Sequence, residues 1–130
     1  MKRTIGRMML AMGLATSLLA AGTAASAKAG DIVRIGACSG ASDWKLKLSP
    51  DNGRIELEFE VDQNKVGATW AVRIKQNGTR IFAGKRMTKA PSGSFTVRLL
   101  AQNHAGTDTF RASATNVATD ESCLGRASIG

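Results

Sequence analysis

The chain has 130 residues, with 18 basic and 10 acidic side chains and a formal net charge of +8. It contains two cysteines, one histidine and no tyrosine. These numbers exclude a multi-histidine metal site, a four-cysteine zinc site and a dense disulfide scaffold. We therefore expect neither a metal nor another cofactor.

Residues 1–27 have the parts of a secretory signal peptide. A basic start is followed by an apolar run over residues 8–21 and by the small residues Ala25-Ser26-Ala27. The run is shorter than the about 20 apolar residues that span a bilayer, and no second apolar run follows. These features predict a secreted protein that is cleaved after Ala27 and keeps no transmembrane segment.

The remaining chain is moderately basic, because three of the 18 basic residues and none of the acidic ones lie in residues 1–27. It has no proline-rich linker and no internal repeat. We expect residues 28–37 to form an N-terminal extension or an edge strand and residues 38–130 to form one domain, with the protein a monomer.

The two cysteines, Cys38 and Cys123, lie 85 residues apart near the two ends of this domain. In an exported protein, a disulfide is the simplest role for such a pair. Closing so long a loop stabilises a fold by roughly 4–5 kcal/mol in the chain-entropy model. A reactive thiol pair is disfavoured, because the Cys-x-x-Cys spacing is absent.

Apolar residues alternate with polar ones along almost the whole domain, and no segment keeps a helical period for three turns. Residues 54–62 are the clearest case, with four apolar side chains on one face and five charged ones on the other. Similar alternation occurs after Pro91-Ser92-Gly93, after Gly106-Thr107-Asp108 and in residues 123–129. The pattern predicts an antiparallel β-sandwich of about seven strands.

Two hairpins are predicted from turn residues. The first has Pro50-Asp51-Asn52-Gly53 as a four-residue loop, with Ser49 facing Arg54. This register pairs oppositely charged residues and two aromatics, namely Lys47 with Glu56, Lys45 with Glu58 and Trp44 with Phe59.

The second hairpin turns at Asn77-Gly78, the strongest short signal for a type I′ turn. A two-residue loop places Ile74 opposite Ile81 and Val72 opposite Ala83 on the inner face. It also places Lys75 opposite Arg80 and Arg73 opposite Phe82 on the outer face.

This pattern resembles an immunoglobulin or fibronectin type III sandwich, with Trp70 on a central strand and a late strand over residues 109–116. The chain also resembles short secreted actinobacterial proteins of unassigned function. The residues that carry this resemblance are Cys38-Ser39-Gly40, the 44–62 hairpin, Pro91-Ser92-Gly93-Ser94-Phe95, Ala105-Gly106-Thr107-Asp108 and Cys123-Leu124-Gly125. The resemblance implies the fold and no activity.

No catalytic constellation is apparent. His104 is the only imidazole, and we expect it in an exposed loop, so a hydrolase that uses His104 is the weakest hypothesis. The carboxylates of Glu56, Glu58, Glu60 and Asp62 share one strand face. Lys45 and Lys47 lie alongside, which favours an ion-pair ladder over a glycosidase pair or a calcium site.

The basic residues are less evenly spread. Six of them, here called the basic ribbon, belong to the second hairpin or the segment after it: Arg73, Lys75, Arg80, Lys85, Arg86 and Lys89. Such a surface attracts anionic partners over a long range. The leading hypothesis is therefore a non-catalytic secreted binding or accessory module that contacts an anionic cell-wall polymer, lipid headgroups or an extracellular protein. The simpler alternative is that the same cations only keep the protein soluble and protect the edges of its sheets.

Two other partners are considered. Nucleic acid is disfavoured, because base stacking needs exposed aromatics and the phenylalanines fall mostly on inward positions. An extracellular hydrolase is the alternative: Lys85-Arg86-Met87-Thr88-Lys89, as an exposed loop, would present a basic side chain to a protease as an inhibitor.

Overall fold

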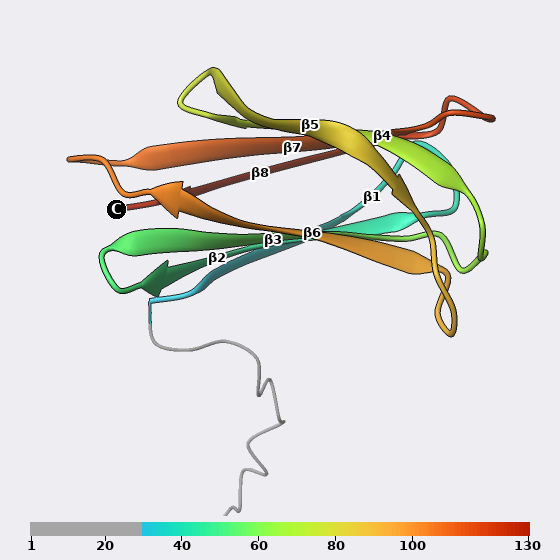
Figure 1. The fold of residues 1–130 in the computed structure, drawn as a ribbon, viewed down its shortest axis with the longest axis horizontal. Helices are drawn as coiled ribbons and strands as arrows, with labels where there is room; N and C mark the ends of the chain where they lie inside the picture. Colours follow the sequence, from blue (N-terminus) through green and yellow to red (C-terminus); the bar gives the residue numbers. More distant parts are fainter. Residues whose placement is uncertain (1–29) are drawn as a thin grey trace, which may run out of the picture.

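The computed structural model describes residues 30–130, which form two antiparallel β-sheets packed face to face (Figure 1). The predicted signal peptide, residues 1–27, lies outside the described residues. The strands are β1 (Ile32–Ala37), β2 (Asp43–Asp51), β3 (Arg54–Asp62), β4 (Thr69–Gln76), β5 (Thr79–Met87), β6 (Ser94–Gln102), β7 (Asp108–Asn116) and β8 (Ser122–Ile129).

Sheet A has the strand order β1-β2-β3-β6, and sheet B has the order β5-β4-β7-β8. The chain passes between the sheets after β3, β5 and β6. The prediction of an all-β antiparallel sandwich is confirmed, with eight strands instead of about seven. Residues 30–130 contain no helix that is long and apolar enough to cross a bilayer.

The core forms because each strand places every second side chain between the sheets. Its largest fully buried members include Trp70, Phe59 and Phe110. The predicted alternation of β6, β7 and β8 is confirmed, since Phe95, Val97, Phe110, Ala112, Ala114, Cys123 and Ala127 are buried. Trp70 also donates a hydrogen bond from its indole Nε1 to Oε1 of Gln63 at 3.0 Å, so its polar atom is satisfied.

The predicted register of the first hairpin is wrong by two residues. Asp51, not Ser49, faces Arg54, and the turn consists of Asn52 and Gly53 alone. Both turn residues have positive φ, 49° and 78°, as a type I′ turn requires. Pro50 lies opposite Ile55, in the pair next to Asp51–Arg54, which closes the hairpin. Hydrogen-bonded and non-hydrogen-bonded pairs alternate along an antiparallel ladder, so an N–H at position 50 would point away from β3. Pro50 therefore fits within β2 without the loss of a hydrogen bond to β3.

The second hairpin has the predicted Asn77-Gly78 turn, with Lys75 opposite Arg80. Beyond that pair the predicted register is wrong, because a β-bulge leaves Ile81 without an opposite residue. Phe82 then faces Ile74 and packs against the core, whereas Ala83 faces Arg73. In the regular register, Ala83 would point toward the core and Phe82 would lie on the outer face. The bulge exchanges their positions, so that the phenylalanine packs against the core.

Edge strands of the two sheets meet where the predicted disulfide is found. Cys38, just after β1, is bonded to Cys123 on β8. Trp44 packs beside this join, and both edge strands have glycine where they meet its indole. A Cβ at Gly36 would lie 2.6 Å from Cζ2 of Trp44, and a Cβ at Gly125 would lie 2.9 Å from its Cε3. No side chain therefore fits at either position without displacing the ring.

Substituting Gly125→Ala should destabilise the protein by about 1–3 kcal/mol, because the added methyl overpacks the site against Trp44. The melting temperature should fall by about 4–8 °C for each kcal/mol. Gly84→Ala on edge strand β5 is the control, since its Cβ would meet only side-chain ends, with Cζ of Phe82 at 3.1 Å and Nη1 of Arg86 at 3.6 Å. In a Trp44→Phe background, the cost of Gly125→Ala should shrink. An equal cost in both backgrounds would show that Trp44 is not the obstacle.

Candidate functional site

The outer face of sheet B carries four cationic side chains in one line across all four strands. Lys75 on β4 lies opposite Arg80 on β5 and also opposite Arg111 on β7, and Arg111 lies opposite Arg126 on β8. All four are exposed. We call Arg80, Lys75, Arg111 and Arg126 the cation row. Since neighbouring strands are about 4.8 Å apart, the row is about 14 Å long.

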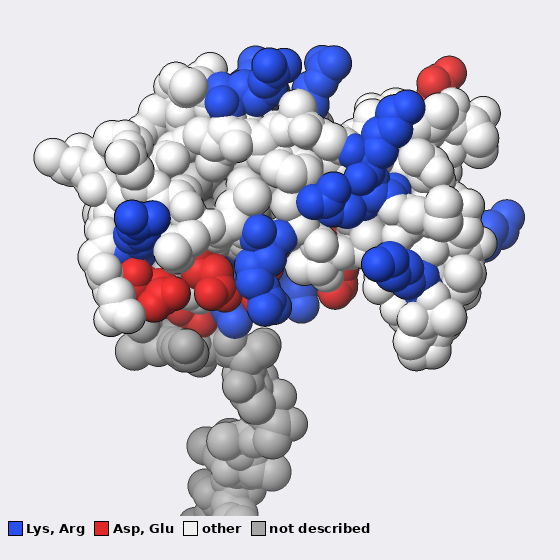
Figure 2. All heavy atoms as spheres, in the orientation of Figure 1, with Lys and Arg blue, Asp and Glu red and all other residues white. Residues whose placement is uncertain are grey.

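No acidic side chain on this face balances the cation row. The strands of sheet B contain seven basic residues, namely Arg73, Lys75, Arg80, Lys85, Arg86, Arg111 and Arg126. Their one acidic residue, Asp108, is fully buried. None of the ion pairs between described residues involves a member of the row. Figure 2 shows basic side chains along the upper surface, over sheet B, and acidic atoms only at its right-hand end.

A hollow of about 220 Å³ lies beside the cation row. It is lined by Arg73, Lys75, Arg111, Ser113 and Leu124. Ser113 on β7 faces Arg73 on one side and Leu124 on the other. Because serine is short and both neighbours are long, the surface is lower at Ser113. The hollow therefore combines three cations, a hydroxyl and one apolar wall.

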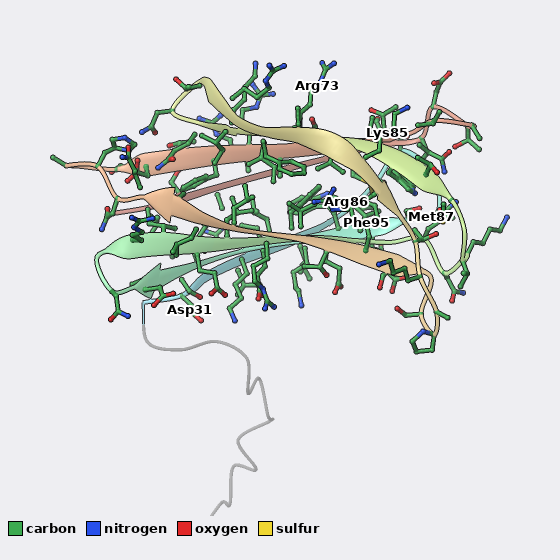
Figure 3. All side chains as sticks on the ribbon, viewed as in Figure 1. Asp31, Arg73, Lys85, Arg86, Met87 and Phe95 are labelled. Atoms are coloured by element: carbon green, nitrogen blue, oxygen red, sulfur yellow. A yellow bond between two sulfur atoms is a disulfide. The ribbon has the colours of Figure 1, made fainter. Side chains whose placement is uncertain are left out.

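The basic ribbon predicted from sequence is only partly one surface. Its members Arg73, Lys75, Arg80 and Lys85 share the outer face of sheet B. Figure 3 shows Arg73 and Lys85 on that outer side, whereas Arg86 lies on the inner side toward Phe95. The bulge turns Arg86 inward, opposite Trp70, with its guanidinium carbon 5.1 Å from the centre of the Phe82 ring.

Sequence reasoning missed Arg111 and Arg126, although both alternate with buried residues on their own strands. Alternation alone would have placed them on an outer face. Which residue each one faces depends on the pairing of β7 with β8 and with β4, and the closest paired residues of β4 and β7, Gln76 and Phe110, are 34 apart in the sequence. No local feature of the sequence therefore predicts the cation row.

The segment Lys85–Lys89 is not the predicted exposed loop. Residues 85–87 belong to β5, and Thr88 is buried. The Thr88 hydroxyl donates to the carbonyl oxygen of Lys65 at 2.6 Å and accepts from the amide of Ala68 at 3.0 Å. Lys89 is exposed but pairs through its backbone with Ser94. The geometry of a protruding inhibitory loop is therefore not present at this position.

The outer face of sheet A has a different charge balance, with four basic and six acidic residues, while the fifth basic residue of its strands, Arg34, lies opposite Leu46 on the inner side. Glu58 lies between Lys47 and Arg98 and forms an ion pair with Arg98. Lys47 forms an ion pair with Asp31 at 3.7 Å. Within residues 30–130, no group of three histidine, cysteine or acidic residues is placed to hold a metal ion. The carboxylates of β3 therefore lie among cations on a mixed surface.

His104 contacts the buried carboxylate of Asp108. Its Nδ1 donates to Oδ1 of Asp108 at 2.7 Å, and its backbone amide donates to Oδ2 at 2.9 Å. Gln76 and Asn77 donate to the same Oδ1, at 3.0 and 2.9 Å. Gln76 also donates to the carbonyl oxygen of Gln102 at 2.7 Å, which links sheet B to sheet A. In the described chain, no hydroxyl or thiol hydrogen-bonds to the other ring nitrogen of His104.

This network keeps Asp108 ionised. Burial acts to raise the pKa of the carboxyl group, but the hydrogen bonds outweigh it. The His104 side chain contributes most, followed by the His104 amide, Gln76 and Asn77, and the net pKa lies below the usual 3.8. The His104–Asp108 pair thus closes one end of the sandwich, while the disulfide and hydrogen bonds from Ser42 to Glu121 close the other.

Comparison of the chain with protein-family models, with curated protein sequences and with solved structures finds no match. The candidate site is therefore defined by its geometry.

Substituting Asp108→Asn should lower the stability by about 2–4 kcal/mol near neutral pH, because charge-assisted hydrogen bonds are lost in a buried site. Since folding lowers the pKa of Asp108, its contribution exists above the unfolded pKa of about 3.9 and disappears as the pH falls through the folded value. Urea unfolding from pH 6 to pH 2 measures this. The wild type should lose stability more steeply than Asp108→Asn below about pH 4.

Asp120→Asn is the matched control, because Asp120 is exposed in a turn with positive φ that asparagine also adopts. This variant should follow the wild-type pH dependence. Identical acid slopes for the wild type and Asp108→Asn would contradict the assigned role of the buried carboxylate.

Proposed function

We propose that the protein is a non-catalytic binding module that holds a linear polyanion, such as an anionic cell-envelope polymer, on the outer face of sheet B. The cation row is the observation that carries this proposal. It offers four positive side chains in a straight line about 14 Å long. An extended chain with regularly spaced anionic groups can contact all four at once.

The energetic cost of the cation row supports binding over simple solubility. Like charges directly opposite each other on paired strands are destabilising, by roughly 0.2–1 kcal/mol for each pair. The row contains three such pairs: Arg80 with Lys75, Lys75 with Arg111 and Arg111 with Arg126. Charges of both signs, interspersed over a surface, give solubility without a continuous line of such repulsive pairs. A bound polyanion removes the repulsion and adds attraction.

The composition of the face favours a polymer without bases. Single-stranded nucleic acids bind by stacking on exposed aromatics as well as by charge. The aromatic residues of sheet B are Trp70, Phe82 and Phe110, and all three pack in or against the core. The charge on this face therefore has no stacking surface beside it. Association should consequently depend on ionic strength and little on the bases of a polymer.

The double variant Lys75→Gln/Arg111→Gln should bind immobilised poly(glycerol phosphate) at least about tenfold more weakly than the wild type, because it removes the centre of the row. Wild-type affinity should fall by about 10- to 50-fold between about 50 and 200 mM salt, through counterion release. Biolayer interferometry measures both effects. The matched control, Lys45→Gln/Arg54→Gln, removes two cations from sheet A and should bind like the wild type. Equal losses in the two double variants would refute sheet B as the binding face.

The single variant Arg111→Glu should be more stable than the wild type by about 0.5–1.5 kcal/mol at low salt, because two repulsive pairs become attractive. The gain should largely vanish at about 1 M salt, where screening is strong. Urea unfolding at both salt concentrations measures it, and Arg111→Gln separates loss of charge from reversal. A gain that does not respond to salt would show that the row is not under electrostatic strain.

A further inference from the structure

We infer that the hollow beside the cation row is a subsite for the phosphate group of a phosphodiester polymer. This inference rests on the proposed function, because it names the chemical group that the same face would hold. The hollow measures about 220 Å³. A water molecule takes about 30 Å³ in the liquid, so a tetrahedral oxyanion fits with part of its hydration shell.

Three cations surround the hollow from different directions. Lys75 and Arg111 are directly opposite each other across β4 and β7. Arg73 lies two residues from Lys75 on the same face, about 7 Å along the strand. A planar carboxylate is satisfied by the fork of a single arginine. A phosphate directs its oxygens to the corners of a tetrahedron, so it can meet cations that do not share one plane.

Ser113 supplies a hydroxyl at the floor of the hollow. In the described chain its one hydrogen bond runs 3.4 Å to the carbonyl oxygen of Arg73. That distance is well beyond the usual 2.7–2.8 Å for a hydroxyl donor. The hydroxyl can therefore turn to a phosphate oxygen at little cost. Its neighbour across the strand pair, Leu124, is an exposed apolar side chain beside three cations.

Leu124 distinguishes an organic phosphate from a free ion. An inorganic anion would make no use of an apolar wall, whereas the carbon segment of an ester would pack on it. The cation row continues beyond the hollow to Arg80 and to Arg126. A diester chain, which leaves the phosphate in two directions, can bring its neighbouring phosphates to these two arginines. The arrangement thus fits a repeating alkyl phosphodiester.

The test uses protein from expression of the full chain, with poly(glycerol phosphate) and poly(glutamate) of equal charge number as probes. The wild type should bind the phosphodiester at least about tenfold more tightly than the polycarboxylate. Ser113→Val removes the hydroxyl and narrows the floor of the hollow without changing any charge. It should therefore lose this preference while keeping polycarboxylate binding. Ser128→Val makes the same change on the same face outside the hollow and should keep the preference.

The outcomes separate the subsite from the face. Equal wild-type affinity for the two polymers would overturn the phosphate subsite and leave the polyanion-binding face standing. The phosphate subsite would also be overturned if the Ser113→Val variant kept the preference for the phosphodiester, or if the Ser128→Val variant lost that preference. Failure of the wild type to bind either polymer would overturn the proposed function itself. In NMR titrations, changes in the amide chemical shifts of Ser113 and Leu124 on addition of the phosphodiester, but not of chloride, would place the phosphate group in the hollow.

Discussion

The structure depends on one geometric constraint, which is that neighbouring residues of a β-strand point to opposite faces. In a two-layer sandwich, every strand residue whose side chain points away from the other sheet therefore lies on an outer face. Strand pairing then decides which outward residues become neighbours. On sheet A it places Glu58 between Lys47 and Arg98, whereas on sheet B it places Lys75 between Arg80 and Arg111. The same rule thus yields a mixed surface and a positive one.

Asp108 shows how the positive surface is kept free of opposing charge. It is the single acidic residue in the strands of sheet B, and it points inward, where four donors share its charge. A carboxylate on the outer face would pair with the nearest arginine and compete with an external anion. Burial of this charge therefore serves two purposes, since it joins the sheets at one end and leaves the cation row unneutralised.

Local features of the fold could be predicted from the sequence, and non-local ones could not. Alternation predicted the strands, Asn77-Gly78 predicted a turn, and the presence of two cysteines in a chain with a predicted signal peptide predicted the disulfide. The bulge at Ile81 has no sequence mark, because it arises from the fit of Phe82 into the core. The cation row needs Arg111 and Arg126, which join Lys75 only when β7 pairs with both β4 and β8. Such pairings depend on how the whole sandwich closes.

The two Asn-Gly turns share a backbone conformation but differ in chemical lifetime. Asparagine before glycine deamidates when the following amide nitrogen attacks its side-chain carbonyl carbon. The Asn77 side chain is held away from this reaction, since it donates to Asp108 at 2.9 Å and accepts from the amide of Thr109 at 2.8 Å. The Asn52 side chain has no hydrogen bond within residues 30–130. As the protein ages, new negative charge therefore arises first beside Arg54 on sheet A, and not on sheet B, which carries the cation row.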